Sequence, residues 1–153
     1  MDIALIWDSI LSGIPADIAV ENDDLKSEEG LRTAVVISLA TDARAKPEQT
    51  DQSSEDLRGY WADIDPASPK TGSLLWTLTR SKQVPSTLRP MEKYAREALQ
   101  WMVDDGIAKS VSVVASDLRT GVWALDVTIT KPDGTASNFR YGGEWDAEAA
   151  RVD

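Results

Sequence analysis

The chain has 153 residues, 42% of them hydrophobic, and its 16 basic and 26 acidic side chains give a net charge of −10. This length and composition predict one globular domain spanning residues 1–153, and the negative charge disfavours nucleic acid and anionic membranes as partners. Cysteine and histidine are absent, which excludes disulfides, thiolate and imidazole metal sites, and Ser-His-Asp catalysis.

The chain opens with two short apolar segments of similar pattern, Asp2–Leu5 and Asp17–Val20. Alternating apolar residues in each predict a small hairpin, whose turn includes Pro15. The apolar patch Ile3–Trp7 is too short for the core of a signal peptide, so we expect the protein to be made and kept in the cytoplasm. Glu21–Asp24 reads as a solvated acidic turn, because it lacks the spaced oxygen ligands of a calcium loop.

A first helix is predicted from about Ser27 to Ala40. Ser27 can cap its start, and Glu28 and Glu29 suit the positive end of the helix dipole. Leu31–Ala40 is apolar on nearly every side, which is typical of a buried helix, although its β-branched residues also allow a strand.

The stretch of about 41–72 is predicted to be a long irregular loop, since it contains three prolines and no sustained periodicity. Loops of this length are usually functional or disordered. An apolar cluster in its middle indicates docking, either on the same domain or on a partner, whereas Glu48–Ser54 is expected to be mobile. The candidate partner contacts in the loop are Leu57, Tyr60, Trp61 and Ile64.

Two further helices are predicted before the C-terminal strands. Ser73–Leu78 begins a short one. A long amphipathic helix follows Pro85 and ends at Asp105, with Gly106 as its stop. We expect it to start at Thr87 or later, because Pro90 then falls in the first turn, where its missing amide costs little. Its apolar stripe comprises Leu88, Met91, Ala95, Ala98, Leu99 and Met102, while Glu92 and Arg96 are placed on the wet side.

The most regular pattern is the strand Val122–Thr130, which alternates between a buried face (Trp123, Leu125, Val127, Ile129) and a wetter face. Ser110–Ala115 precedes it, and the turn Lys131–Gly134 leads to a return strand at about 135–141. These three strands predict an antiparallel meander. The fold class is therefore α+β, an antiparallel sheet (N-terminal hairpin plus C-terminal meander) with two or three helices packed on it.

No catalytic, cofactor or metal site emerges from the residues. Acidic pairs such as Asp104-Asp105 lie in turns, and 26 acidic residues make some chance pair inevitable. No phosphate-binding glycine loop is present. Of the six tryptophans, Trp61 and Trp145 lie outside the periodic segments. Because tryptophan is enriched at protein interfaces, these two are the better candidates for partner contact.

An ordered set of segments resembles the small baseplate protein of Mu-like contractile-tailed bacteriophages, a relative of the wider wedge proteins once labelled lysozyme-like. The Glu-Pro-Arg motif of that wider family is absent, so its interface residues cannot be carried across. The stretch Leu25–Gly30 is also longer than the Mu-like pattern. The segments that carry the resemblance are Asp2–Asp8, Leu31–Asp42, Arg58–Trp61, Gly72–Trp76, Tyr94–Gly106 and Thr130–Gly134.

The resemblance implies a non-enzymatic virion structural protein of a phage or prophage tail. It would take part in wedge assembly by contacting other wedge proteins and the tail tube or sheath, and it would lie in the virion baseplate. No cofactor, nucleic acid, membrane or small-molecule substrate is implied. Two alternatives remain open at this point, a carboxylate-based peptidoglycan hydrolase and a host-directed regulatory binder.

Overall fold

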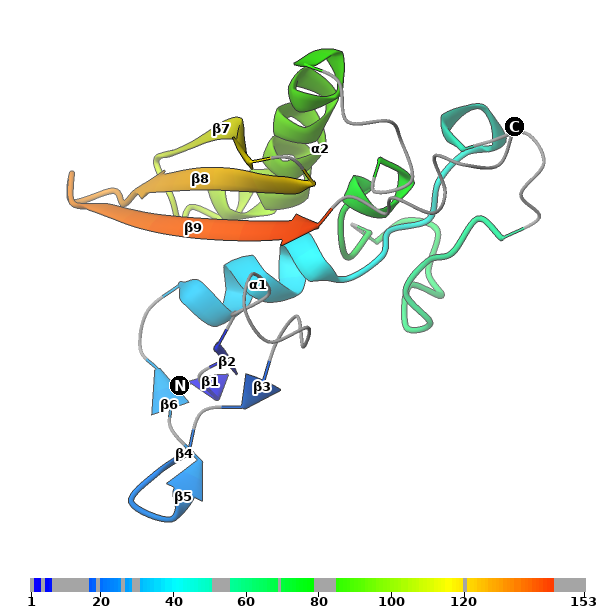
Figure 1. Cartoon of the computed structure of the whole chain (residues 1–153). Helices are drawn as coiled ribbons and strands as arrows, with labels where there is room; N and C mark the ends of the chain where they lie inside the picture. The colour runs from blue at the N-terminus through cyan, green and yellow to red at the C-terminus, as the bar shows by residue number, and fades with distance from the viewer. Residues whose placement is uncertain are drawn as a thin grey trace.

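The computed structural model describes residues 2–3, 5–6, 17–18, 20–25, 27–28, 31–50, 56–68, 70–78, 85–119 and 121–144. A three-stranded antiparallel sheet and two helices form its centre (Figure 1). Short N-terminal strand pairs lie below helix α1, and an irregular lobe (residues 41–50, 56–68 and 70–78) extends to the right. The α+β class predicted from the sequence is confirmed.

The sheet is the predicted meander, with strand order β7-β8-β9. Its strands are β7 (Ser110–Arg119), β8 (Val122–Thr130) and β9 (Ala136–Glu144). The bounds of β8 match the prediction, whereas β7 continues past Ala115 and contains an irregularity between Asp117 and Arg119. In the middle of the sheet Val127 lies between Val113 and Phe139. Neighbouring apolar side chains therefore face the same side of the sheet.

The two faces of β8 differ as its alternation predicts. Leu125, Val127 and Ile129 are fully buried, with 0% exposure. On the reverse face the Arg140 guanidinium donates to both oxygens of the Asp126 carboxylate, at 2.7 and 3.1 Å. Val114 on that face is 55% exposed. The sheet thus has one core face and one largely polar face, although Ala124 on the reverse face is also buried.

The turn between β8 and β9 has the predicted chemistry. Gly134 adopts a φ of 89°, and its amide donates to the carbonyl of Lys131 at 2.9 Å. The Asp133 carboxylate accepts from the amide and hydroxyl of Thr135, at 2.8 and 2.6 Å. These bonds hold the pKa of Asp133 below its usual value, and the bond from the Thr135 hydroxyl has the larger effect. The turn therefore fixes the β8–β9 register locally.

Helix α2 (Pro85–Asp104) supplies the largest apolar stripe. The predicted start at Thr87 or later is wrong, because the helix begins at Pro85 and contains Pro90. Pro90 lacks the amide of one helical bond. Burial of Met91 and Leu99, worth roughly 1.5–3 kcal/mol for each side chain, offsets that loss. Beyond the end of the helix, the amide of Ile107 donates to the carbonyl of Met102 at 2.9 Å.

Helix α1 (Arg32–Ala40) begins later than predicted. Ser27 does not cap it, because Ser27–Glu28 forms strand β6, which pairs with β1 (Asp2–Ile3). Leu31 precedes the helix and makes no side-chain capping bond. A pairing with residues distant in the sequence has overridden the local helix signal. The helix is not buried on all sides either, since Ile37 is 47% exposed.

The remaining N-terminal strands confirm the predicted hairpin in part. Strand β2 (Leu5–Ile6) pairs with β3 (Asp17–Ile18). The residues after Ile18 do not extend that hairpin, since β4 (Val20–Glu21) pairs with β5 (Asp24–Leu25). Asn22 and Asp23 form the intervening turn with φ of 54° and 61°, as a tight two-residue hairpin turn requires. The acidic turn is thereby confirmed.

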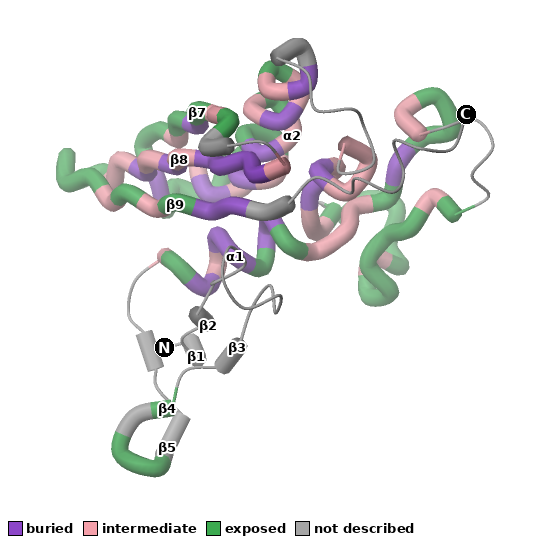
Figure 2. Tube along the Cα trace, in the orientation of Figure 1, coloured by how far each residue is buried: buried purple, intermediate pink, exposed green. Residues whose placement is uncertain are grey.

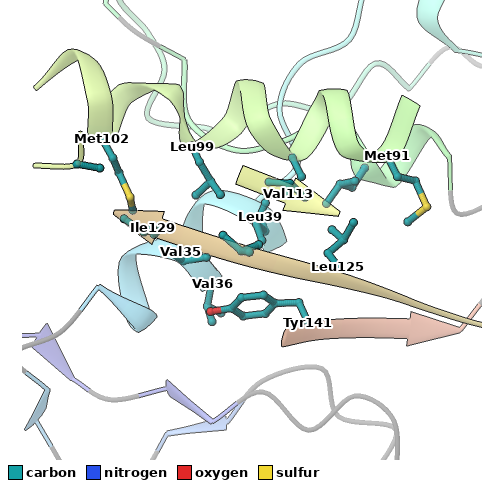
Figure 3. Packing of buried hydrophobic residues seen from close by; sticks show 14 of the residues in the cluster. Val35, Val36, Leu39, Met91, Leu99, Met102, Val113, Leu125, Ile129 and Tyr141 are labelled. Atoms are coloured by element: carbon teal, nitrogen blue, oxygen red, sulfur yellow. The ribbon is translucent and has the colours of Figure 1, made fainter. Parts of the chain in front are cut away.

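The core lies between the sheet and both helices (Figure 3). Two polar contacts tie its layers together. The indole N–H of Trp101 on α2 donates to the Ser38 hydroxyl on α1 at 3.0 Å. Glu92 is not paired with Arg96 on the wet side as predicted, because its carboxylate accepts from the Ala115 amide of β7 at 2.9 Å. The labelled core side chains are Val35, Val36, Leu39, Met91, Leu99, Met102, Val113, Leu125, Ile129 and Tyr141.

Candidate docking site

The lobe comprises the described residues of the irregular loop predicted at about 41–72, together with residues 73–78. Figure 2 shows it as mostly exposed and intermediate, whereas most of the buried residues lie in the helices and strands. It contains two single 3-10 turns, η1 (Pro47–Gln49) and η2 (Leu75–Thr77). The short helix predicted from Ser73 is therefore only one turn long.

The base of the lobe is fastened to the end of α1. The amide of Ala43 donates to the Ser73 carbonyl, and the amide of Ser73 donates to the Thr41 carbonyl, both at 2.9 Å. The buried Ser73 hydroxyl donates to the Leu39 carbonyl at 2.7 Å. Gly72 has a φ of 99°, and an added Cβ would lie 2.4 Å from the Thr41 carbonyl oxygen. Only glycine fits this crossing.

Arg58 holds the middle of the lobe. Its guanidinium lies 2.6 Å from the Asp42 carboxylate and 5.0 Å from the centre of the Trp76 ring. The Trp76 indole donates in turn to the Ala43 carbonyl at 2.8 Å. Arg58 also has a positive φ of 44°, an uncommon conformation for a residue with a Cβ. The sequence analysis quoted Arg58 only within a motif. Nothing in the sequence around Arg58 predicted its ion pair with Asp42.

The apolar tip of the lobe faces away from the core. Trp61 is 82% exposed, Ile64 is 81% exposed and Tyr60 is 37% exposed. The rings of Tyr60 and Trp61 lie 5.7 Å apart at their centroids. Leu57 is half-buried, and its carbonyl accepts from the Ala45 amide at 3.0 Å. The structure thus brings the four candidates of the loop into one lobe, and their role as partner contacts stays a prediction.

The fifth candidate, Trp145, lies outside the described residues, as does Trp7. Of the tryptophans within the periodic segments, Trp123 is buried, whereas Trp76 and Trp101 are half-buried. Residues 51–55 are also not described, so the predicted mobility of Glu48–Ser54 stays a prediction for most of that stretch.

The two arms of the lobe enclose a groove of about 710 Å³. Its lining includes four basic side chains and one acidic side chain, Asp63. The Asp63 carboxylate accepts from the amide and hydroxyl of Thr71, at 2.9 and 3.0 Å. The groove is lined by Arg44, Ala45, Lys46, Pro47, Leu57, Arg58, Gly59, Tyr60, Trp61, Asp63 and Lys70.

The other acidic side chains of the lobe serve its turns. The Asp65 carboxylate accepts from the Ala67 amide at 2.9 Å and from the Ser68 hydroxyl at 3.2 Å. These bonds lower the pKa of Asp65, and the bond from the Ala67 amide has the larger effect. Among the described residues no group of three or more Asp and Glu side chains could hold a metal ion. No described helix is long and apolar enough to cross a membrane.

The described residues thus form a small α+β core that presents a folded lobe with an exposed apolar tip and a groove lined by four basic side chains. The sequence comparisons identify the family. A profile of the family described as Phage protein GP46 matches residues 31–136, which is more than half of the chain. The chain belongs to this family. This match and the two relatives that follow confirm the resemblance to the small baseplate proteins of Mu-like phages.

Two relatives match almost the whole chain. The Mu-like prophage FluMu protein gp46 of Haemophilus influenzae is 38% identical over 144 residues, covering 94% of this chain and 97% of the relative. Baseplate protein gp46 of Escherichia phage Mu is 37% identical over 141 residues, covering 92% and 94%. No solved structure gives a significant match.

Proposed function

We propose that the protein is a structural component of a contractile-tail baseplate and takes part in wedge assembly through protein–protein contacts. The observation that carries this proposal is the 37% identity to the phage Mu baseplate protein over nearly all of both chains. The protein would lie in the baseplate of the virion tail after passing through the host cytoplasm during assembly. Its direct neighbours would be other wedge proteins and components of the tail tube or sheath.

The lobe is the surface that we assign to these contacts. Trp61 and Ile64, three positions apart in the tip, both expose large apolar side chains. Such side chains gain most from burial by a partner. The lobe is tied down at its base and middle, by Ser73 and by Arg58, so its tip requires little further ordering on binding. Leu57, Tyr60 and Trp145 complete the proposed contact set.

The same proposal assigns no catalytic activity, nucleic acid, membrane or small-molecule substrate to the protein. Hydrolysis by paired carboxylates needs an acid with a raised pKa. The Asp65 and Asp133 carboxylates accept hydrogen bonds within their own turns, which lower their pKa values, so neither of these two is such an acid. The comparisons offer no support for a lysozyme-like hydrolase. A net charge of −10 also opposes binding to nucleic acid or anionic lipid.

The test is co-purification after co-expression with the other baseplate proteins encoded by the same phage or prophage. Trp61→Ala should leave the melting temperature almost unchanged, since the side chain is 82% exposed, while weakening co-purification. The matched control is Val114→Ala, which truncates an exposed apolar side chain on the sheet and should retain the partner. A loss of about 3 kcal/mol of stability in Trp61→Ala would instead assign Trp61 to the core. Failure of the parent protein to retain any baseplate protein would contradict the proposed function itself.

A further inference from the structure

The basic groove of the lobe runs against the charge of the whole protein. Acidic side chains outnumber basic ones by 26 to 16 along the chain, whereas the groove lining has four basic side chains and one acidic side chain, Asp63. The negative charge of the whole protein repels acidic groups, whereas a locally basic surface attracts them.

The four basic side chains are not equally engaged. Arg58 is paired with Asp42 at 2.6 Å and with Asp56 at 3.6 Å. The Lys70 ammonium donates to the carbonyl of Asp65 at 2.8 Å, and its charge also lowers the pKa of the Asp65 carboxyl. These two cations therefore already have acidic neighbours within the lobe.

Arg44 and Lys46 are different. Arg44 donates to the carbonyl of Arg58 at 3.4 Å, and neither Arg44 nor Lys46 forms an ion pair with any described residue. Both side chains are exposed. They lie on one arm of the groove on either side of the buried Ala45, and both line the groove. They are the charges that a ligand can use.

The walls of the groove are preformed. The Ala45 amide donates to the carbonyl of Leu57, which joins the two arms at 3.0 Å. The Lys46 amide donates to the Gln49 side chain at 2.9 Å, fixing the turn that follows. Gly59 packs so closely on Arg44 that an added Cβ would lie 3.1 Å from the Arg44 Cβ. A binding partner would not have to order these arms.

We propose that the groove binds an extended acidic segment of a partner protein, with its carboxylates paired to Arg44 and Lys46. Apolar side chains of the same segment would lie against Pro47, Leu57 and Trp61 on the groove walls. A volume of about 710 Å³ is within the range of built ligand sites. That the partner is another baseplate protein rests on the proposed function, whereas the acidic chemistry rests on the groove.

The experiment uses the full chain and a double variant, Arg44→Gln/Lys46→Gln. Its matched control is Lys93→Gln/Arg96→Gln, which removes one lysine and one arginine from the exposed side of α2 and changes the net charge equally. Co-purification with the co-expressed baseplate proteins identifies the partner. Overlapping synthetic peptides that cover this partner are then titrated against each protein by fluorescence anisotropy.

The strongest-binding peptide should be rich in Asp and Glu. Loss of two exposed charge pairs should weaken its binding by about tenfold in the groove variant, with little change in the α2 variant. Equal binding by the two variants, a strongest peptide that is neutral or basic, or self-association that the groove variant abolishes would each overturn the proposal. In those cases the baseplate role is still supported if the parent protein co-purifies with a baseplate protein. Failure of the parent to retain any partner contradicts the baseplate role instead.

Discussion

Truncation of Leu125 tests the core at its centre. Leu125 lies on β8 between Ala115 and Tyr141, and its side chain is fully buried. Leu125→Ala removes the buried methyl groups and leaves a cavity that the sheet and both helices cannot easily fill. Such substitutions cost about 3–5 kcal/mol, and for a chain of this size the melting temperature should fall by about 10 °C or more. That cost is a large share of a typical total stability of about 5–15 kcal/mol.

The measurement is equilibrium urea unfolding, followed by tryptophan fluorescence and far-ultraviolet circular dichroism. The midpoint should fall while the slope stays constant, because the surface exposed on unfolding hardly changes. Val114→Ala on the open face of β7 is the control, and it should stay within about 0.5 kcal/mol of the parent. If Leu125→Ala unfolds within about 1 kcal/mol of the parent, the facing assigned to β8 is wrong.

Two further substitutions test contacts that hold the layers and the lobe in place. Gly72→Ala should lose at least about 2 kcal/mol, because the new Cβ meets the Thr41 carbonyl. Gly134→Ala has a similar positive φ but open space around it, so in urea unfolding it should lose less. Glu92→Ala should lose about 1.5–3 kcal/mol and speed hydrogen exchange at the Ala115 amide. If Glu92→Ala leaves hydrogen exchange at the Ala115 amide unchanged, the contact is refuted. Glu97→Ala, which truncates an exposed glutamate of the same helix, is the control.

The meander was predictable from the sequence because its signals are local and agree with one another. Strict alternation along Val122–Thr130 specifies which side of β8 is buried, and the turn at Gly134 sets the partner and register of β9. Helix α2 was predictable for the same reason, apart from its start. The helix begins at Pro85 and contains Pro90, and a rule about proline in isolation does not weigh the packing of the whole helix.

The N-terminal pairings could not be predicted in full because their determinants lie far apart. Ser27–Glu28 joins Asp2–Ile3 through main-chain hydrogen bonds, which leave no periodic trace in the side chains. The local helix signals at Ser27 were real propensities, and tertiary pairing outweighed them. Glu92 was misplaced for a related reason, since its spacing from Arg96 suits a helical ion pair but its partner is a strand amide.

The lobe shows the same division between local and distant information. Its apolar cluster was visible in the sequence, and the exposure of Trp61 and Ile64 follows from three-dimensional packing alone. Arg58 had no signal, because its partners Asp42 and Trp76 approach it from opposite sides in the sequence. The groove residues Arg44 and Lys46 were likewise unremarked, since two basic residues in an irregular stretch resemble any solvated surface.

The net charge of the protein and the preformed arms of its groove both affect which surfaces the protein can bind. A net charge of −10 makes free copies repel one another and most acidic surfaces. A local basic groove reverses that preference over a small area, so an acidic segment is attracted only when it reaches this site in the correct geometry. The arms are already joined by the Ala45–Leu57 bond and clasped by Arg58, so little binding energy is spent on ordering them. On our proposal, the net negative charge weakens binding of acidic segments elsewhere on the protein, and the basic groove strengthens their binding at this site. Specificity is the difference between these two binding free energies.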